Sequence, residues 1–176
     1  SPGGKQFVYW NNLAKEYYLM NTDSQVEECL TCAWKGNFFE DKNGMIEDDD
    51  PMGIIGWGPK DGNIYIQAEK DILSYEVASK QLRSFTASLQ NSEQDTNYNY
   101  AIYNLNPDSV NFYPENMVLT RFSKITKVMD VYRVKDVSGK VPFELISGSG
   151  HHYFNFTKAK QGSRILFNRS SNSDFP

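Results

Sequence analysis

Cysteine is scarce in this chain of 176 residues: it occurs only at Cys29 and Cys32, in the segment ECLTCAW. A Cys-x-x-Cys pair is found in redox motifs, in zinc sites, as a short disulfide and as two small buried side chains. A redox motif places the pair before the N-terminus of a helix, whereas the following AWKGNFFE has the composition of a strand. The remaining soft zinc ligands are His151 and His152, and adjacent residues on a strand point to opposite faces. We therefore keep the pair as a candidate disulfide and expect no metal site.

An excess of basic residues and long apolar runs are also lacking. The formal net charge is -4 and the isoelectric point is near 5.2. This charge argues against nucleic acid or an anionic membrane as the main partner, because either would attract a clustered basic face. No run approaches the roughly 18 to 20 apolar residues that a membrane span requires. The opening SPGGKQF has no apolar signal centre, and we interpret residues 1–6 as an artificial, processed or flexible start.

Aromatic residues, by contrast, are abundant. They make up 14% of the chain, with 11 Tyr, 11 Phe and 3 Trp. Such side chains favour strands and line pockets, so they suit a β-rich ligand-binding domain as well as an ordinary β core. The length fits one domain spanning residues 1–176.

The spacing of apolar residues predicts two helices. In residues 5–19, large apolar side chains recur about one helical turn apart, at Phe7, Trp10 and Leu13, as in a short amphipathic helix. In residues 120–134 a similar spacing follows a candidate N-cap at Thr120 or Ser123, which predicts a second helix late in the chain.

The other periodic runs predict strands, because aromatic or β-branched residues alternate with polar ones between turn signals. The strands are expected at residues 17–21, 31–39, 53–57, 63–68, 72–77, 84–89, 98–104 and 110–113, the last extending toward residue 120. Three further strand-like runs, KVPFELIS, HHYFNF and SRILFN, follow the second helix, and residues 169–176 form a polar tail. This regular succession of short strands and turns indicates a mainly β, antiparallel barrel or sandwich.

The stretch FEDKNGMIEDDD, residues 39–50, has the length of a calcium-binding EF-hand loop. Such a loop needs an oxygen ligand at its first position, where this chain has Phe39. Asn43 and Gly44 instead form the strongest short-range signal for a hairpin turn, because both central positions of that turn need positive φ. We therefore predict a hairpin tip followed by a solvated acidic loop.

Two stretches resemble the tick salivary lipocalins. In that family a Trp and a Leu on a short helix precede a Tyr-Tyr-Leu strand and then a Cys, as in WNNLAKEYYLMNTDSQVEEC from Trp10 to Cys29. YAIYNLNPDSVNFYP, from Tyr100 to Pro114, is similar to the family's Tyr-rich strand, turn and strand. The resemblance implies a lipocalin-like antiparallel β-barrel with a short N-terminal helix and one late helix. It also implies two disulfides, although Ser109 stands where one of their cysteines is expected.

The function implied by the resemblance is the sequestration of a small molecule, such as an amine, a fatty-acid derivative or a sterol, inside the barrel. The protein would be a secreted salivary protein, without catalysis or a cofactor, and with a host protein as a further partner. The triplets NFT at Asn155 and NRS at Asn168 are glycosylation acceptors in a secretory pathway, which also favours secretion.

The candidate ligand contacts are aromatic residues of the alternating strands and one carboxylate flanked by apolar residues, which would pair with an amine. These residues are Trp34, Phe38, Trp57, Tyr65, Glu76, Tyr100 and Phe112. The same aromatic residues would also suit an ordinary core. The alternative function is a β-sandwich that binds a protein or a carbohydrate through exposed Tyr and Trp side chains and holds no internal ligand.

Overall fold

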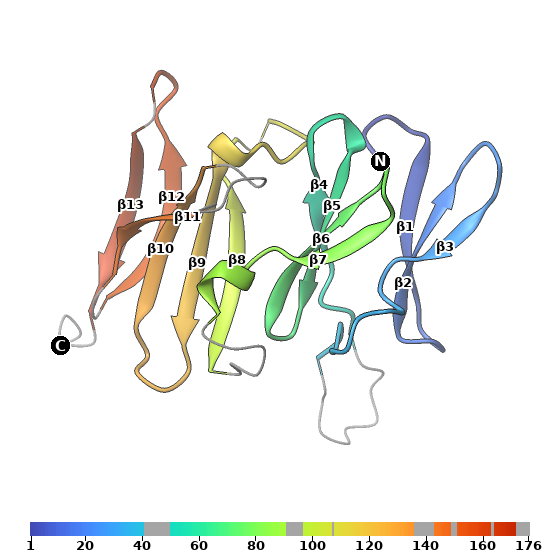
Figure 1. Ribbon diagram of the computed structural model, residues 1–176. Helices are drawn as coiled ribbons and strands as arrows, with labels where there is room; N and C mark the ends of the chain where they lie inside the picture. Colours follow the sequence, from blue (N-terminus) through green and yellow to red (C-terminus); the bar gives the residue numbers. More distant parts are fainter. Residues whose placement is uncertain are drawn as a thin grey trace. The chain divides into compact units, whose positions relative to one another are not determined.

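The computed structural model describes residues 1–40, 50–90, 97–106, 108–135, 143–148, 151–162 and 164–171. Within these residues the regular structure consists of antiparallel strands and three short 3-10 helices, so the mainly β prediction is confirmed. The chain divides into two compact units, unit 1 (Ser1–Thr86) and unit 2 (Ala87–Pro176). In each of the four sheets, strands that are neighbours in the sequence are hydrogen-bonded to one another (Figure 1).

Unit 1 contains a three-stranded sheet and a four-stranded sheet. The first consists of β1 (Gln6–Asn11), β2 (Glu16–Asn21) and β3 (Glu27–Cys29), and the second of β4 (Ile54–Trp57), β5 (Asn63–Ala68), β6 (Asp71–Glu76) and β7 (Gln81–Ser84). A 3-10 turn, η1 (Pro59–Asp61), lies between β4 and β5. Tyr17 and Leu19 of β2 are buried in one apolar cluster with Ile64 and Ile66 of β5. The two sheets therefore share a core.

The alternation of side chains explains how β5 serves as the central strand of that core. Ile64 and Ile66, two residues apart, lie on one face and are fully buried in the shared cluster. Tyr65 points to the opposite face, where its ring packs edge-on against Phe85 at 5.3 Å between centroids. Both faces of β5 are thus covered, and the segment 63–68 forms the strand that the sequence predicts.

Unit 2 is also built from two antiparallel sheets. The first contains β8 (Tyr98–Asn104), β9 (Met117–Ser123), β10 (Met129–Val134) and β11 (Phe143–Ser147), and the second contains β12 (His152–Lys158) and β13 (Ile165–Ser170). The remaining 3-10 turns are η2 (Ala87–Leu89) and η3 (Pro114–Asn116). Val118 of β9, Val131 of β10 and Tyr153 of β12 are buried in one cluster, which joins the two sheets of this unit.

The prediction of a closed barrel is wrong. Among the described residues each of the four sheets has two distinct edge strands, and none of the sheets closes on itself. Closure would need a first strand hydrogen-bonded to the last one of the same sheet. In both units the apolar side chains are instead buried by packing one open sheet on another.

The predicted N-terminal helix is wrong as well. Residues 5–19 form the hairpin β1–β2, in which Trp10 is paired with Tyr17. The turn is set by Asn11, whose side-chain oxygen accepts hydrogen bonds from the backbone N–H groups of Leu13 and Ala14, each at 3.0 Å. Leu13 is 99% exposed, so the apparent apolar stripe does not exist. Asn side chains favour turns over helices because they bond to nearby backbone groups in this way.

The late helix is wrong for the same physical reason. Residues 120–134 form the hairpin β9–β10, with Arg121 paired with Asp130. Ser123 does accept a hydrogen bond from the backbone N–H of Thr126, at 3.1 Å, as an N-cap would. Lys127 then adopts a left-handed conformation, φ 59°, and the chain reverses into β10. The capping signal at Ser123 was therefore real, but it begins a turn.

The strand predictions are confirmed at 63–68 and 98–104, and the boundaries of others differ. Residues 110–113 were predicted as a strand but contain a single bridge residue, at 111, and then lead into η3. Residues 31–39 were predicted as a strand but form turns and irregular backbone. Residues 84–89 contain the end of β7 and then η2. Of the acidic stretch 39–50, residues 41–49, and with them the predicted hairpin tip, lie outside the described residues. A bridge pairs Phe39, its first residue, with Pro51, which follows it.

Candidate functional site

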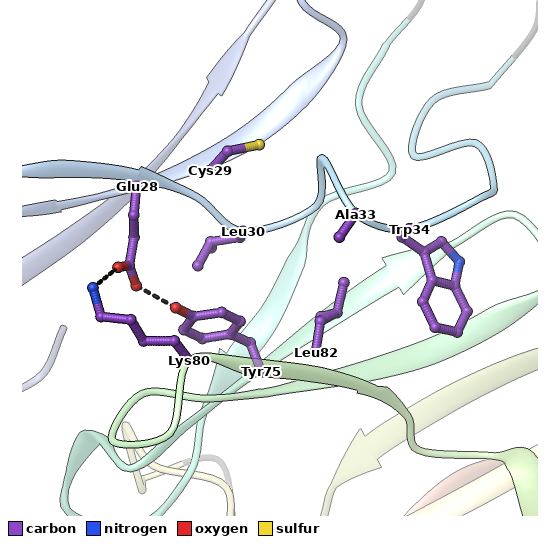
Figure 2. A pocket seen from close by; sticks show the side chains of 8 residues that line it. All are labelled: Glu28, Cys29, Leu30, Ala33, Trp34, Tyr75, Lys80 and Leu82. Carbon is purple, nitrogen blue, oxygen red and sulfur yellow. Dashed lines mark hydrogen bonds and ion pairs between the residues drawn. The ribbon is translucent and has the colours of Figure 1, made fainter.

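The candidate site is a pocket of about 280 Å³ in unit 1. Figure 2 shows it between β3 with its following loop and the β6–β7 hairpin. Pockets of this size hold a small ligand when they combine apolar walls with a few well-placed polar groups. The lining residues are Glu28, Cys29, Leu30, Ala33, Trp34, Tyr75, Lys80 and Leu82.

One end of the pocket is polar. The carboxylate of Glu28 accepts a hydrogen bond from the hydroxyl of Tyr75 at one oxygen and from the ammonium group of Lys80 at the other (Figure 2). The side chain of Glu28 is 24% exposed and that of Lys80 is 67% exposed. The carboxylate thus lies within the pocket, while Lys80 reaches it from the solvent side.

The electrostatics keep this polar end in one protonation state near neutral pH. Burial alone would raise the pKa of Glu28, but the hydrogen bonds from Lys80 and Tyr75 outweigh burial, and the pKa is lowered. Burial raises the pKa of Tyr75, and its hydrogen bond to Glu28 raises it further. Glu28 is therefore an ionised acceptor and Tyr75 a protonated donor.

The β6–β7 hairpin positions two of the lining residues on one face. Tyr75 and Leu82 are paired directly across the hairpin, and residues opposite each other on antiparallel strands point to the same side of the sheet. Lys80 lies in the turn and has a left-handed conformation, φ 56°. This turn directs Lys80 back toward β3, where Glu28 lies.

The other end of the pocket is apolar and contains the indole of Trp34 (Figure 2). Trp34 follows a turn closed by a hydrogen bond from its backbone N–H to the carbonyl of Thr31, at 2.8 Å. Gly36 leaves room for the ring, because a Cβ atom at this position would lie 3.0 Å from the indole Nε1 of Trp34. Trp34 also packs against the core of unit 1, and its half-buried ring lines this end of the pocket together with Leu82.

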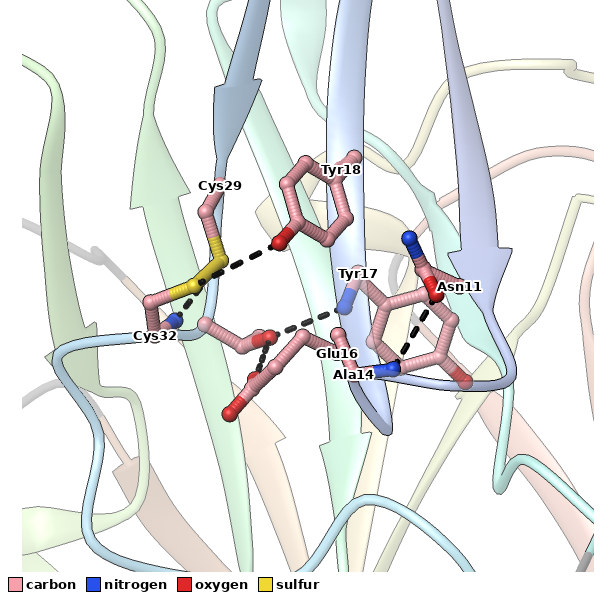
Figure 3. The surroundings of a disulfide bond; sticks show 8 residues. Asn11, Ala14, Glu16, Tyr17, Tyr18, Cys29 and Cys32 are labelled. Atoms are coloured by element: carbon pink, nitrogen blue, oxygen red, sulfur yellow. Dashed lines mark hydrogen bonds between the residues drawn. A yellow bond between two sulfur atoms is a disulfide. The ribbon is translucent and has the colours of Figure 1, made fainter.

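A disulfide joins Cys29 and Cys32 at the edge of the pocket (Figure 3). Their Cα atoms are 5.7 Å apart. The backbone N–H of Cys32 donates a hydrogen bond to Sγ of Cys29, at 3.0 Å. The hydroxyl of Tyr18 lies 4.0 Å from Sγ of Cys32. The carboxylate of Glu16 completes a group of three donor atoms, which all lie within 4.8 Å of one another.

Of the seven ligand contacts that the sequence suggests, Trp34 lines this pocket. Phe38 and Tyr65 are each 1% exposed and belong to the packed interior of unit 1, and Trp57 is half-buried against the same core. Glu76 is exposed at the end of β6 and accepts a hydrogen bond from the hydroxyl of Ser79. Tyr100 and Phe112 belong to unit 2, where Tyr100 is buried and Phe112 half-buried. Trp34, Phe38 and Trp57 therefore share the core cluster of unit 1, and of the five candidates in this unit Trp34 is the one that lines the pocket.

The polar residues of the pocket were missed by sequence reasoning. Glu28 stands next to Glu27 in a polar stretch of the sequence, which is typical of solvated surface. Its partners Tyr75 and Lys80 are 47 and 52 residues away. No local pattern links residues at such separations, so only the fold reveals the group.

Unit 2 contains a second pocket, of about 270 Å³, which is rich in basic side chains. Among its cations, Lys135 pairs with Glu144, at 3.3 Å, and Lys158 donates a hydrogen bond to Asn116. The predicted glycosylation acceptors Asn155 and Asn168 are exposed in the same unit, on β12 and β13.

In comparisons with protein-family models, curated proteins and solved structures, nothing matches this chain. The resemblance to the tick salivary lipocalins therefore stays a prediction. Within the described residues no helix is long and apolar enough to cross a membrane.

Proposed function

We propose that this chain is a non-enzymatic binding module, and that the pocket of unit 1 holds a small, neutral, hydroxyl-rich ligand such as a single sugar unit. The observation that carries the proposal is the Glu28–Tyr75–Lys80 group lying in one pocket with the indole of Trp34. The alternative function that the sequence suggests is a β-sandwich that binds a protein or a carbohydrate without an internal ligand, and the proposal is related to its carbohydrate-binding form. Its ligand, however, would lie in a pocket and not on a flat surface.

The charge of the pocket favours a neutral ligand. Glu28 carries one negative charge and Lys80 one positive charge, and the two side chains are paired. A cationic ligand would have to compete with Lys80 for Glu28, and an anionic one would have to draw Lys80 away from Glu28. A hydroxyl group both donates and accepts hydrogen bonds, so it can bond to the carboxylate or to the hydroxyl of Tyr75 while the pair stays intact.

The apolar end favours a ligand with an apolar face. The face of an aromatic ring is apolar and carries a partial negative charge. The C–H groups on one side of a sugar ring are weakly positive and can pack against such a face. Trp34 and Leu82 supply this wall at the end of the pocket away from the polar group, and Leu30 lies nearer to Tyr75 (Figure 2).

A barrel interior for an amine, a fatty-acid derivative or a sterol is not formed among the described residues. These ligands nevertheless remain rivals for the unit 1 pocket, and the test below includes them. Secretion also belongs to the proposal. The disulfide Cys29–Cys32 supports it, because disulfides persist in oxidising compartments, as does the exposure of both acceptors, Asn155 and Asn168.

Tryptophan fluorescence provides the test, because Trp10, Trp34 and Trp57 all lie in unit 1. The full chain is titrated with glucose, galactose, mannose and N-acetylglucosamine, and in parallel with tyramine, lauric acid and cholesterol. We expect saturable binding of at least one neutral sugar, with a dissociation constant on the order of 1 mM, equivalent to about -4 kcal/mol. Saturable binding confined to tyramine, lauric acid or cholesterol, or no saturable binding at all, would overturn the proposal.

Matched variants locate the binding site by calorimetry, which needs no indole signal. Trp34→Ala and Glu28→Gln are expected to weaken sugar binding at least about tenfold, a loss of 1.4 kcal/mol. Glu69→Gln serves as the control, because Glu69 is a 40% exposed carboxylate of unit 1 that pairs with Lys70 and does not line the pocket. Unchanged affinity in both pocket variants would place the sugar elsewhere.

A further inference from the structure

The Cys29–Cys32 pair lies next to a carboxylate on the same face of the first sheet. Tyr18 is paired with Cys29 across β2 and β3, so the two side chains point to the same side. Glu16 is two residues before Tyr18 on β2 and therefore shares that side. The fold thus brings Glu16 and both sulfur atoms together, with their donor atoms within 4.8 Å of one another (Figure 3).

The group around Glu16 is ordered by a buried hydroxyl. Thr31 is fully buried, and its hydroxyl donates a hydrogen bond to one oxygen of the Glu16 carboxylate. The same hydroxyl oxygen accepts a hydrogen bond from the backbone N–H of Tyr17, at 2.9 Å. These two hydrogen bonds fix the orientation of the Glu16 carboxylate. Partners of this kind orient the ligands of a metal ion and raise its affinity.

The sulfur atoms are arranged as metal ligands commonly are. Their spacing, two residues between two cysteines, is the one found in structural zinc sites. The hydrogen bond from the backbone N–H of Cys32 to Sγ of Cys29, at 3.0 Å, would stabilise a thiolate at Cys29. Cys32 is exposed and Cys29 is half-buried, so an ion could reach the group from solvent.

We propose that the reduced chain binds one Zn²⁺ through Sγ of Cys29, Sγ of Cys32 and the carboxylate of Glu16, with a water molecule as the fourth ligand. A dithiol reductant first transfers two electrons and two protons to the disulfide: the S–S bond breaks, each cysteine becomes a thiol, and the reductant becomes a disulfide. Zn²⁺ then displaces the two thiol protons into solvent. Zn²⁺ accepts sulfur and carboxylate ligands in tetrahedral geometry and needs no redox change of its own.

The disulfide and the zinc complex exclude each other, because both use the same two sulfur atoms. The cluster would therefore bind metal only where a reductant is present. The site shares Cys29 with the proposed sugar pocket, but neither Glu16 nor Cys32 lines that pocket. Variants of Glu16 and Cys32 therefore test zinc binding separately from sugar binding.

The test uses the full chain reduced with a phosphine, which replaces the dithiol and avoids adding a competing thiol ligand. Zn²⁺ is titrated in competition with a chromophoric chelator, and Co²⁺ is used to detect thiolate-to-metal charge-transfer absorption. We expect one equivalent of Zn²⁺ on the reduced chain and none on the oxidised chain. Equal binding by both forms, or no binding by the reduced form, would overturn the site.

Two variants separate the three-ligand site from simple chelation by a cysteine pair. Cys32→Ser should abolish the charge-transfer absorption of a two-thiolate complex. Glu16→Gln keeps an oxygen that can accept the Thr31 hydrogen bond. It should weaken Zn²⁺ binding at least about tenfold, because even the loss of a residue that only orients a metal ligand typically lowers metal affinity by that factor. Glu69→Gln is the carboxylate control and should bind as the unaltered chain does. Undiminished affinity in a folded Glu16→Gln variant, checked by circular dichroism, would contradict the role of Glu16.

Discussion

The hydroxyl of Tyr75 donates a hydrogen bond to the carboxylate of Glu28, which lies 47 residues earlier in the chain and on the other sheet of unit 1. Tyr75 is 3% exposed, so its ring belongs to the core while its hydroxyl reaches the pocket. A tyrosine often combines these two roles, because one end of its side chain is apolar and the other polar. The bond joins the two sheets at the polar end of the candidate site.

Tyr75→Phe should remove this bond and keep the packing of the ring. We expect the free energy of unfolding to fall by about 1 kcal/mol, the typical net contribution of one hydrogen bond, and the pKa of Glu28 to rise because one donor is lost. Urea unfolding and NMR titration of the carboxyl carbon would measure the two effects. Tyr103→Phe, at a 41% exposed tyrosine, should stay within about 0.5 kcal/mol. An unchanged pKa of Glu28 in Tyr75→Phe would contradict the bond.

The pair formed by Glu28 and Lys80 should make part of the stability of unit 1 dependent on pH. The pKa of Glu28 is lower in the folded chain than in the unfolded one, for which a Glu pKa near 4.3 is usual. The contribution is therefore fully present above about pH 5 and is lost as the pH falls through the folded pKa. A double-mutant cycle of Glu28→Gln and Lys80→Met should give a favourable coupling energy at pH 7 that shrinks at pH 3. Equal coupling energies at both pH values would show that the charge of the Glu28 carboxylate does not contribute to its interaction with Lys80.

In unit 2, replacing Arg121 by Lys should lower the free energy of unfolding. Its guanidinium donates two hydrogen bonds to one oxygen of Asp130, at 2.7 and 3.1 Å, and one to the carbonyl of Leu89, at 2.9 Å. It also lies 4.6 Å from the centre of the Tyr98 ring. Lysine keeps the charge but cannot reproduce this planar fork. We expect Arg121→Lys to lower the free energy of unfolding by about 1 to 3 kcal/mol.

Arg83→Lys provides the matched control for this measurement, because Arg83 is exposed on β7. It should change the free energy of unfolding by less than about 0.5 kcal/mol. If Arg121→Lys were equally mild in urea unfolding, the packed position of Arg121 between Tyr98 and Asp130 would contribute nothing to stability.

The sequence predicts strands where alternation and turn signals agree, as in 63–68 and 98–104, which became β5 and β8. It fails where a three-residue spacing arises by chance across a turn. Phe7 and Trp10 lie on β1, whereas Leu13 lies in the turn and is exposed. Spacing alone could not show this, because the decisive interaction is the local bonding of the Asn11 side chain to the turn.

The candidate sites were predictable only in part. Trp34 and the Cys29–Cys32 pair are recognisable from residue type and spacing. Glu28 and Glu16 are not, since their roles depend on contacts across strands and across sheets. The search for zinc ligands in the sequence turned to His151 and His152, which belong to the other unit. A glutamate offers no soft donor atom, so only the pairing of β2 with β3 reveals Glu16 as a third ligand.

The reduced chain should remain folded, because the disulfide closes a very short loop. Only two residues lie between Cys29 and Cys32, and the chain-entropy model then gives a stabilisation of about 2 kcal/mol. The core of unit 1 is built from residues of both sheets and includes neither cysteine, although Leu30 inside the disulfide loop belongs to it. Reduction, or the double replacement of Cys29 and Cys32 by Ser, should lower the free energy of unfolding by about 2 kcal/mol and leave a cooperative transition in urea. The serine variant should not respond to reductant. Loss of the transition on reduction would mean that the disulfide is required for folding, and zinc would then have to restore the fold as well as bind.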